Sequence, residues 1–430
     1  YDQAQLLDVF VEAWQVTNDA EFRETALAIA DYVLGQLTHP EGGFYSAQDA
    51  QSEGKEGKYW CWTEEELKAL LSESEFAAAR DWFGFTEPGN FIDHSDPQPL
   101  KKQNVLFRAN PGAQLDAGEK KVLEAAISKM RTARSKRVPP ATDDKILASW
   151  NGLMIAAMAR AGRILGEPRY LAAAQKAHAF VVSKLWNPAT KTLSHRWREN
   201  HVDASQLSES YLYFLRASRI LYEATLDPGY LSLAVELAAK ARILFYDEGN
   251  GGFFDGEQRD DLVFRIKDDY DSATPTPSSV ARLEHSVLAE ITGSEEFRAV
   301  AEKSLRAAAL TLKESPTQLA ESLRALEFMM GKPARIVIVG ESRKEEFLKV
   351  SWSGIRHNLL IIGNEGPVSG FTRKLEAKAP GETTVYYCVG QTCRLPETDP
   401  DVLAGWLKED RGAGRKDRDR VPIPPGPGPE

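Results

Sequence analysis

The sequence predicts a mainly α-helical protein, an (α/α)6-type toroid of helical hairpins followed by a small C-terminal α/β part. Three observations predict it: one helix–turn–helix pattern recurs along the chain, one helical segment is apolar on every side, and strand-like apolar runs appear only late. The chain has 430 residues, of which 42% are hydrophobic and 27% are charged, and this composition is sufficient for a large core.

The recurring pattern is an amphipathic helix, a break carrying Gly, Asp, Asn or Pro, an aromatic residue and a second helix. The breaks read TNDAEF, LGEPRY, TLDPGY and TGSEEF, and they end at Phe22, Tyr170, Tyr230 and Phe297. Repeats of this kind are typical of helical arrays in which each unit buries its apolar face against its neighbours.

The segment from Leu153 to Ala159 is apolar on all sides, and this favours the inner ring of a two-layer toroid. Paired glycines followed by aromatics, in EGGFYSAQDA (41–50) and NGGFFDGEQ (250–258), indicate short turns or hairpins that close the helical pairs. If the hairpins stack in register, these connections emerge at one end of the toroid. Loops held on a rigid scaffold are where binding residues concentrate.

The character of the chain changes after about residue 330. The runs ARIVIVG (334–340) and HNLLIIG (357–363) are predicted as buried strands. We therefore expect a toroid over 1–330, a small α/β part over 331–409, and a disordered tail over 410–430, which is rich in charge and proline. The chain opens without Met inside a predicted helix, so we expect that the upstream start of the toroid is missing.

The composition also restricts the partners. A formal net charge of −10 argues against nucleic acid, which usually requires a basic face. No run approaches the roughly 18 apolar residues that a membrane span needs. Three cysteines are too few for a disulfide framework, so we expect a reducing, cytoplasmic location. There is no HExxH, HxH, GxSxG or phosphate-binding motif, and we expect neither a metal nor a cofactor.

The first candidate site lies in GGFYSAQDAQSEGKEGKYWCWT (42–63). It combines Gln48 and Asp49 with the aromatic rings of Tyr45 and Trp60. Sugars are recognised by such mixtures, because acceptor oxygens bind hydroxyl groups and flat rings cover the apolar side of the sugar. The alternative is an ordered loop whose aromatics pack on the helices and whose acids are solvated.

The second candidate site lies in TDDKILASWNGLMIAAMARAG (142–162). Asp144 stands where a helix is expected to start, and N-capping is the alternative to a catalytic role. Asn151 lies on the apolar face of the predicted helix and should be buried. Its side-chain amide must therefore find hydrogen-bond partners. Trp150 and Asn151 would suit a wall of the central cavity, unless the amide instead caps the backbone of a neighbouring loop.

The third candidate site lies in IKDDYDSATPTPSS (266–279), where Asp271 precedes a rigid loop. Glu209 opens another helix of the inner type. Two carboxylates that face each other across a site perform glycoside hydrolysis as acid plus base or nucleophile. The alternative for Asp271 is a structural role, in which its side chain stabilises a turn or caps a helix.

Cys388 and Cys393 are a candidate redox pair. A two-residue turn at Gly390-Gln391 suits type II′ geometry, and the two cysteines then face each other as a non-hydrogen-bonded pair. A cross-strand disulfide is feasible there, but we favour free thiols.

Several segments together resemble one known family, and they occur in the family's order from Tyr1 to about residue 409. These segments are YDQAQLL, GGFYSAQDAQSEGKEGKYWCWT, DDKILASWNGLMIAA, GGFF, YDSATPTPSS, ARIVIVG and CxxxxCxxP. They are similar to the YyaL/spermatogenesis-associated protein 20 family. The resemblance implies an upstream thioredoxin-like domain, which this chain lacks, followed by a six-hairpin-glycosidase-like toroid.

The resemblance also implies a set of pocket positions. They are Gln48, Asp49, Asp144, Trp150, Asn151 and Asp271. Two departures stand out. The family usually carries a GGFHRYS…PHFEKM-like stretch just before YDQA, and this chain begins after it. Where relatives read LEDYA, this chain reads LSESY, so Ser210 replaces the second acid and a catalytic pair there would be impaired or altered.

The leading functional hypothesis is a carbohydrate-acting or carbohydrate-binding toroid with glycosidase-like or epimerase-like acid/base chemistry. Asp49, Asp144 and Asp271 are its acid/base candidates, and a saccharide is the expected ligand. The alternative is a non-catalytic scaffold or client-binding module that works with a thioredoxin-like partner domain.

Overall fold

The structure is a computed structural model that describes residues 1–354, 358–390 and 392–418, with side chains to residue 409. The chain forms two compact units. The first joins residues 1–45 to the chain from residue 145 onward, and the second is Ser46–Asp144. Within the described residues, no helix combines the length and the apolarity that crossing a bilayer requires.

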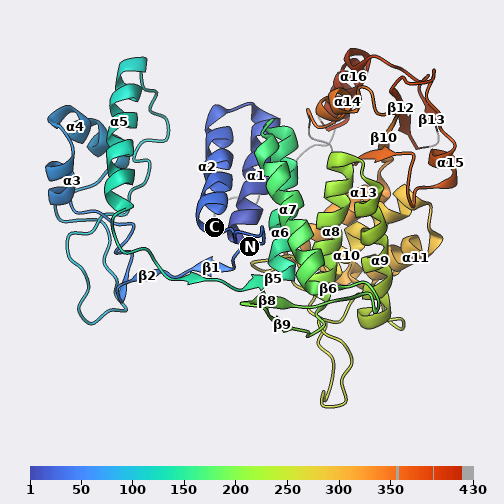
Figure 1. Ribbon diagram of the computed structural model, residues 1–430, viewed down its shortest axis with the longest axis horizontal. Coiled ribbons are helices and arrows are strands. Elements are labelled where there is room, and N and C mark those ends of the chain that lie inside the picture. The colour runs from blue at the N-terminus through green and yellow to red at the C-terminus, as the bar shows by residue number, and fades with distance from the viewer. Residues whose placement is uncertain (355–357, 391, 419–430) are drawn as a thin grey trace, which may run out of the picture. The chain divides into compact units, whose positions relative to one another are not determined.

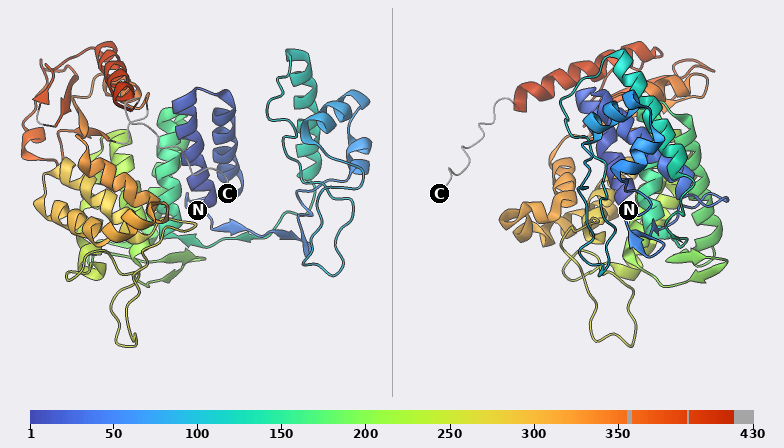
Figure 2. Two further views of the ribbon diagram at one scale, coloured as in Figure 1. Left: turned by 180° about the vertical axis from the view of Figure 1, so that it is seen from behind. Right: turned by 90° about the vertical axis from the view of Figure 1, so that its left-hand side faces the viewer.

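The first unit is built from helical hairpins (Figures 1 and 2). Each hairpin pairs an inner helix with an outer helix, and the pairs α1–α2, α6–α7, α8–α9 and α10–α11 pack together. The inner helices pack in the order α1, α6, α8, α10 and α13. The bounds are α1 Asp2–Thr17, α2 Ala20–Gln36, α6 Ala148–Ile164, α7 Pro168–Leu185, α8 Ser208–Thr225, α9 Pro228–Phe245, α10 Pro277–Thr292, α11 Glu295–Ala307, α12 Ala309–Glu314, η1 Pro316–Leu319 and α13 Ala320–Met330. The predicted toroid of helical hairpins is confirmed.

Burial separates the inner helices from the outer ones. In α6, 13 of 17 residues are buried, and in α8 the number is 15 of 18, whereas α7 buries 7 of 18. The all-round apolar character of Leu153–Ala159 therefore reflects an inner position, as predicted. Inner neighbours also approach closely: a Cβ at Gly152 of α6 would lie 2.5 Å from the Tyr213 carbonyl carbon of α8. Only glycine fits there.

The turns that close the hairpins are held by the next inner helix. The Phe44 amide donates to Oδ1 of Asn151 at 2.7 Å, and the Phe253 amide donates to Oγ of Ser278 at 2.8 Å. The Leu193 amide, in the hairpin of β6 (Trp186–Asn187) and β7 (Thr192–Leu193), donates to the Tyr211 hydroxyl at 2.8 Å. The three acceptors lie in the first turns of α6, α10 and α8. The loops therefore gather at one end of this unit, as the paired glycines predicted.

The C-terminal α/β part is a four-stranded sheet with the strand order β11-β10-β12-β13. Only the β10–β11 pair is parallel. The bounds are β10 Ala334–Val339, α14 Lys344–Ser351, β11 Leu359–Gly363, α15 Gly370–Arg373, β12 Thr384–Val389, β13 Thr392–Cys393 and α16 Pro400–Arg418. The helix α16 enters the segment predicted as a disordered tail, and residues 419–430 of that tail lie outside the described residues.

Cys388 and Cys393 face each other in the predicted register and are joined by a disulfide, with 3.9 Å between their Cα atoms. The preference for free thiols was therefore wrong in this structure, because the strand pairing holds the two side chains together. Gln391, in the predicted turn, lies outside the described residues.

The second unit interrupts the segment that the sequence assigns to the toroid. It contains α3 (Glu64–Leu70), α4 (Glu73–Phe83) and α5 (Ala117–Arg134), which pack on one another. Short strands lie before α3 and after α5: β1 Ala47–Gln48, β2 Gln51–Ser52, β3 Lys55–Glu56 and β4 Thr142–Asp143. It has a small apolar core of its own, made of Trp62, Leu67, Leu71, Ala79, Phe85, Ala126 and Met130. The other predicted domain limits, at 330 and 409, stay predictions.

Candidate active site at the loop end of the toroid

The first candidate group is the carboxylate of Glu209, in the first turn of α8. The buried Ser149 hydroxyl of α6 donates to Oε1 of Glu209 at 3.0 Å. A hydrogen bond from a buried hydroxyl fixes the direction of the carboxylate that accepts it. The two inner helices therefore hold one carboxylate at the loop end.

The second group is Asp255, which follows the glycine pair of the loop after α9. The Ser208 amide donates to the Asp255 carbonyl at 2.9 Å, and Leu207 forms a β-bridge with Gly256. These main-chain contacts place the loop beside the start of α8, so that Asp255 lies near Glu209. The Asp268 amide donates to Oδ1 of Asp255 at 3.3 Å.

The environment of Asp255 shifts the protonation equilibrium of its carboxyl group. Partial burial raises the pKa of Asp255, and the negative charges of Asp268 and Glu209 raise it further. Two nearby titratable groups whose environments separate their protonation states are the arrangement that acid/base enzymes use. Sequence analysis missed Asp255, because a residue after GGFF resembles an ordinary turn residue. Its signal was the position in a loop that recurs after each hairpin.

His195 lies close to the same helix ends. Its carbonyl accepts from the Ala148 amide at 2.9 Å, and the following residue, Arg196 of β8 (Arg196–Arg198), pairs with Leu147 of β5 (Ile146–Leu147). β8 also pairs with β9 (His201–Asp203). In the part of the chain that the structure describes, Nδ1 of His195 is buried and has no hydrogen-bond partner. This histidine was not singled out from the sequence.

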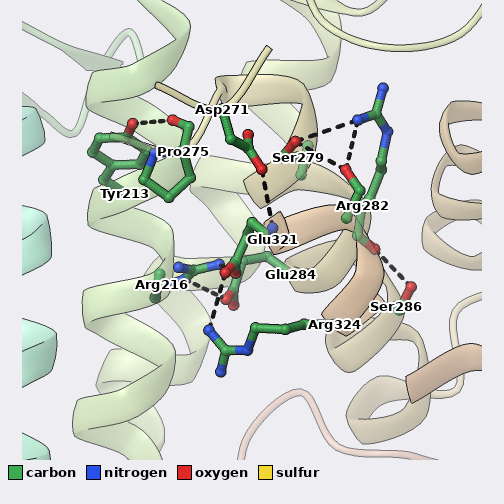
Figure 3. A network of polar contacts seen from close by, with 12 residues as sticks. Tyr213, Arg216, Asp271, Pro275, Ser279, Arg282, Glu284, Ser286, Glu321 and Arg324 are labelled. Carbon is green, nitrogen blue, oxygen red and sulfur yellow. Dashed lines mark hydrogen bonds and ion pairs between the residues drawn. The ribbon is translucent and has the colours of Figure 1, made fainter. Parts of the chain in front are cut away.

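Asp271 was predicted to be catalytic, and the structure gives it a backbone role instead. Its Oδ1 accepts from the Thr276 amide at 2.8 Å. Its Oδ2 accepts from the Glu321 amide at 2.9 Å (Figure 3). Both carboxylate oxygens thus fix the starts of α10 and α13. The turn-and-cap alternative describes this geometry.

Asn151 also holds the backbone. Besides accepting from the Phe44 amide, its Nδ2 donates to the carbonyls of Phe44 at 3.0 Å and Leu147 at 2.9 Å. The side chain is 1% exposed, so it fastens a loop, which was the alternative to a cavity wall. Trp150 is half-buried, and its ring meets that of Tyr1 edge to face with centroids 4.8 Å apart. Tyr45 packs edge to face on His39.

The remaining predicted residues belong to the second unit. Gln48 pairs with Thr142 in a short sheet, and Asp49 is exposed, with Oδ1 accepting from the Gln51 amide at 3.0 Å. Trp60 lies under the Arg134 guanidinium at 4.6 Å. Asp144 ends this unit and does not cap α6, whose N-cap residue is Leu147. The N-cap alternative for Asp144 was therefore wrong, because β5 separates it from the helix.

A buried charge network lies among the inner helices (Figure 3). Arg216 of α8 donates to Glu284 of α10 at 2.8 Å and also contacts Glu321 of α13. Arg219 binds both oxygens of Glu284, at 2.5 and 3.0 Å. Burial opposes ionisation of Glu321, but Arg216 and Arg324 overcome it and lower its pKa to about 2. The network was not predicted, because charged residues in a helix usually face solvent.

Metal binding has no visible support in the geometry. Across residues 1–354, 358–390 and 392–409, no three His, Cys, Asp or Glu side chains are grouped so as to hold a metal ion.

Comparisons with known proteins find relatives that match the chain over more than nine tenths of its length. No protein-family model matches it. Human spermatogenesis-associated protein 20 is 30% identical over 446 residues, which cover 94% of this chain and 57% of the relative. The uncharacterized protein B0495.5 of Caenorhabditis elegans is 28% identical and covers 92% of this chain. The chain thus spans a little over half the length of these relatives.

Several of the solved structures that match part of the chain are glycoside hydrolases. The α-mannanase BT2949 of Bacteroides thetaiotaomicron, from family GH76, is 12% identical with a TM-score of 0.28, covering 77% of this chain and 74% of the enzyme. A family 105 glycoside hydrolase of C. acetobutylicum is 10% identical with a TM-score of 0.36, covering 74% and 79%. At such scores the likeness carries no argument about chemistry.

Proposed function

The chain is a homologue of spermatogenesis-associated protein 20 over 94% of its length, and on that footing we propose that its toroid binds a saccharide and performs acid/base chemistry on it. The observation that carries the proposal is the pair of carboxylates at the loop end. Glu209 is directed by Ser149, whereas Asp255 has a raised pKa beside it. Hydrolysis of a glycosidic bond uses one protonated and one ionised carboxyl group.

Each carboxylate has a defined task in this mechanism. Asp255, which keeps its proton to a higher pH, donates that proton to the leaving oxygen of the glycosidic bond. Glu209, oriented by the Ser149 hydroxyl, acts on the anomeric carbon from the other side, directly or through a water molecule. The same pair could exchange a proton at a sugar carbon in an epimerase-like reaction. Trp150, next to Ser149 in sequence, offers a flat aromatic face for the sugar.

The sequence-based assignment of Asp49 and Asp144 stays a prediction. These acids belong to the separately folded second unit, and the proposed pair does not depend on them. Ser210, which stands where relatives carry a second acid, is fully buried, and its hydroxyl has no hydrogen-bond partner among the described residues.

The test is a screen of saccharides against the full-length protein, first by binding and then by turnover. We expect Asp255→Asn and Glu209→Gln each to lower turnover of a bound saccharide by at least a hundredfold while binding persists. Asp260→Asn is the matched control, because Asp260 is an exposed carboxylate of the same loop. Equal activity of Asp255→Asn, Asp260→Asn and the parent protein would remove Asp255 from the mechanism.

A second candidate function is a non-catalytic scaffold for a thioredoxin-like domain of the longer protein. The engagement of both oxygens of Asp271 with main-chain amides favours it, since a predicted catalytic acid has a structural task. Under this reading, Asp255→Asn leaves the cellular function intact, and no saccharide protects the toroid from thermal unfolding.

A further inference from the structure

The two cysteines of the C-terminal sheet differ in their access to solvent. The strands β12 and β13 are neighbours in that sheet (Figure 1), and the disulfide between Cys388 and Cys393 crosses from one to the other. Cys388 lies on the inner strand β12 and is 1% exposed, whereas Cys393 lies on the edge strand β13 and is half-buried. A thiol from solution therefore meets the disulfide from the side of Cys393.

The two strands are also held together by their main chains. The Arg394 amide donates to the Tyr387 carbonyl at 2.9 Å. Val385 and Glu397 exchange two hydrogen bonds, of 2.7 and 3.0 Å. These bonds keep the chain after Cys393 against β12 whether or not the sulfur atoms are bonded. A disulfide that closes so short a loop constrains the unfolded chain little. The disulfide can therefore open and form again while the sheet stays folded.

A positive charge lies on the face of the sheet that carries the disulfide. Arg335 of β10 is the partner of Cys388 in the strand register. Residues directly opposite each other on neighbouring strands share a face, with Cβ atoms about 4.5–5.5 Å apart. The Arg335 guanidinium also donates to the Gly390 carbonyl at the turn, so it is held beside the hairpin. A guanidinium near a sulfur stabilises its thiolate, and a stabilised thiolate leaves faster in thiol–disulfide exchange.

A second arginine close in sequence has a different position. Arg394 follows Cys393 directly, and successive side chains of an extended chain point to opposite faces. Its guanidinium lies over the rings of Tyr387 and Trp406, at 5.7 and 5.3 Å from their centroids. Arg394 is therefore a matched control for Arg335, because the two charges lie on opposite faces of the same hairpin.

We propose that Cys388 and Cys393 form a reversible thiol–disulfide exchange site for a low-molecular-weight thiol. The thiolate of the small molecule bonds to Sγ of Cys393, the bond between the two cysteines breaks, and its electron pair stays on Sγ of Cys388. A second small thiolate then attacks the sulfur of the first, which releases the small disulfide and leaves Cys393 as a thiolate. The cysteines gain two electrons and two protons, and the two small thiols lose them. Nothing in this proposal depends on the carboxylate pair at the loop end.

Cys61, in the second unit, is an internal reference for this chemistry. It is a free cysteine that is 3% exposed. Burial raises the pKa of the Cys61 thiol, although the charge of Arg137 opposes the shift. Because the thiolate is the reactive form, Cys61 should stay unmodified in the folded protein.

The experiment treats the folded full chain with a large excess of reduced glutathione, stops the reaction with acid at intervals, and locates each adduct by peptide mass spectrometry. We expect a glutathione adduct at Cys393, then loss of the disulfide. Hydrogen exchange of a peptide over residues 384–389 should stay within about twofold of the oxidised protein. Arg335→Gln should slow this reduction about fivefold, whereas Arg394→Gln should change it by less than about twofold.

Two serine variants test which sulfur is attacked. Cys388→Ser leaves Cys393 without its partner, so oxidised glutathione should form a stable adduct there. Cys393→Ser leaves only the buried Cys388 in the sheet, and it should react at least about tenfold more slowly. Equal rates in the two variants, or adducts at Cys388, would contradict the assigned direction.

The measurement on the parent chain needs no variant and decides the proposal by itself. A disulfide that glutathione leaves intact in the folded protein, but cleaves in urea, has a structural role only and overturns the proposal. Equal slowing by Arg335→Gln and Arg394→Gln would overturn the role given to Arg335.

Discussion

Replacing Asn151 by alanine should loosen the first loop of the toroid and destabilise the whole unit. The amide makes three hydrogen bonds to the main chain, of which the two to Phe44 are buried. At about 1 kcal/mol each, their loss removes about 3 kcal/mol. The Phe44 amide and carbonyl are then left in a buried place without these partners, and this raises the expected loss to about 3–5 kcal/mol. Ser278→Ala removes two equivalent bonds to Phe253 and should cost about 2 kcal/mol.

Two measurements together test this prediction. Urea unfolding followed by tryptophan fluorescence gives the change in the free energy of unfolding. Hydrogen exchange of peptides that span residues 38–45 reports whether the Phe44 amide loses protection locally. A free energy of unfolding within about 0.5 kcal/mol of the parent, together with unchanged exchange at Phe44, would refute the idea that Asn151 fastens this loop.

Three further predictions concern packing and pH. Gly152→Ala should lower the free energy of unfolding, measured in urea, by at least about 2 kcal/mol, because its Cβ would lie 2.5 Å from the backbone of α8. Gly35→Ala, with nothing within 4 Å of its Cβ, should stabilise the protein slightly instead. Because the pKa of Asp255 is raised, the unfolding free energy should fall as the pH rises from about 4 through the folded pKa, and Asp255→Asn should remove this fall. Turnover by the protonated form should decline over the same interval. Glu321, with a pKa lowered to about 2, should contribute about 3 kcal/mol to the free energy of unfolding above pH 4.5. This contribution should be lost as the pH falls towards 2, and Glu321→Gln should remove the corresponding pH dependence of the free energy of unfolding.

The sequence predicted the hairpins because their signals are local. The breaks before Phe22, Tyr170, Tyr230 and Phe297 carry glycine, proline or capping residues, and each one lies at a helix start in the structure. The signal for the inner position of Leu153–Ala159 was also local, since the apolar character of this segment extends around the helix. By contrast, residues 46–144 fold on their own core, and no change of composition marks where the chain leaves the toroid and returns.

The candidate site was predicted less well, because its chemistry depends on contacts between distant residues. Glu209 and Asp255 are 46 positions apart, and main-chain contacts such as the bond between the Ser208 amide and the Asp255 carbonyl bring them together. Asp271 resembled a catalytic acid, and its partners include an amide 50 residues away. In the sequence, Arg216 resembles a solvent-facing residue. Its carboxylate partners, Glu284 and Glu321, come from distant helices and become its neighbours only in the fold.

The fastening of Phe44 to Asn151 has a topological consequence for the chain. The first unit is interrupted after Tyr45 and continues from Lys145. The hydrogen bonds between Phe44 and Asn151 connect these two segments on either side of the inserted second unit. The ends of the inserted unit are therefore brought together by residues that belong to its host. The entropic cost of closing a loop grows only by about 0.6 kcal/mol for each doubling of its length. The stability of the first unit should therefore depend little on the number of residues that are inserted there. We therefore expect that a short glycine-rich linker or an unrelated domain can replace residues 46–144 without changing the fold of the first unit.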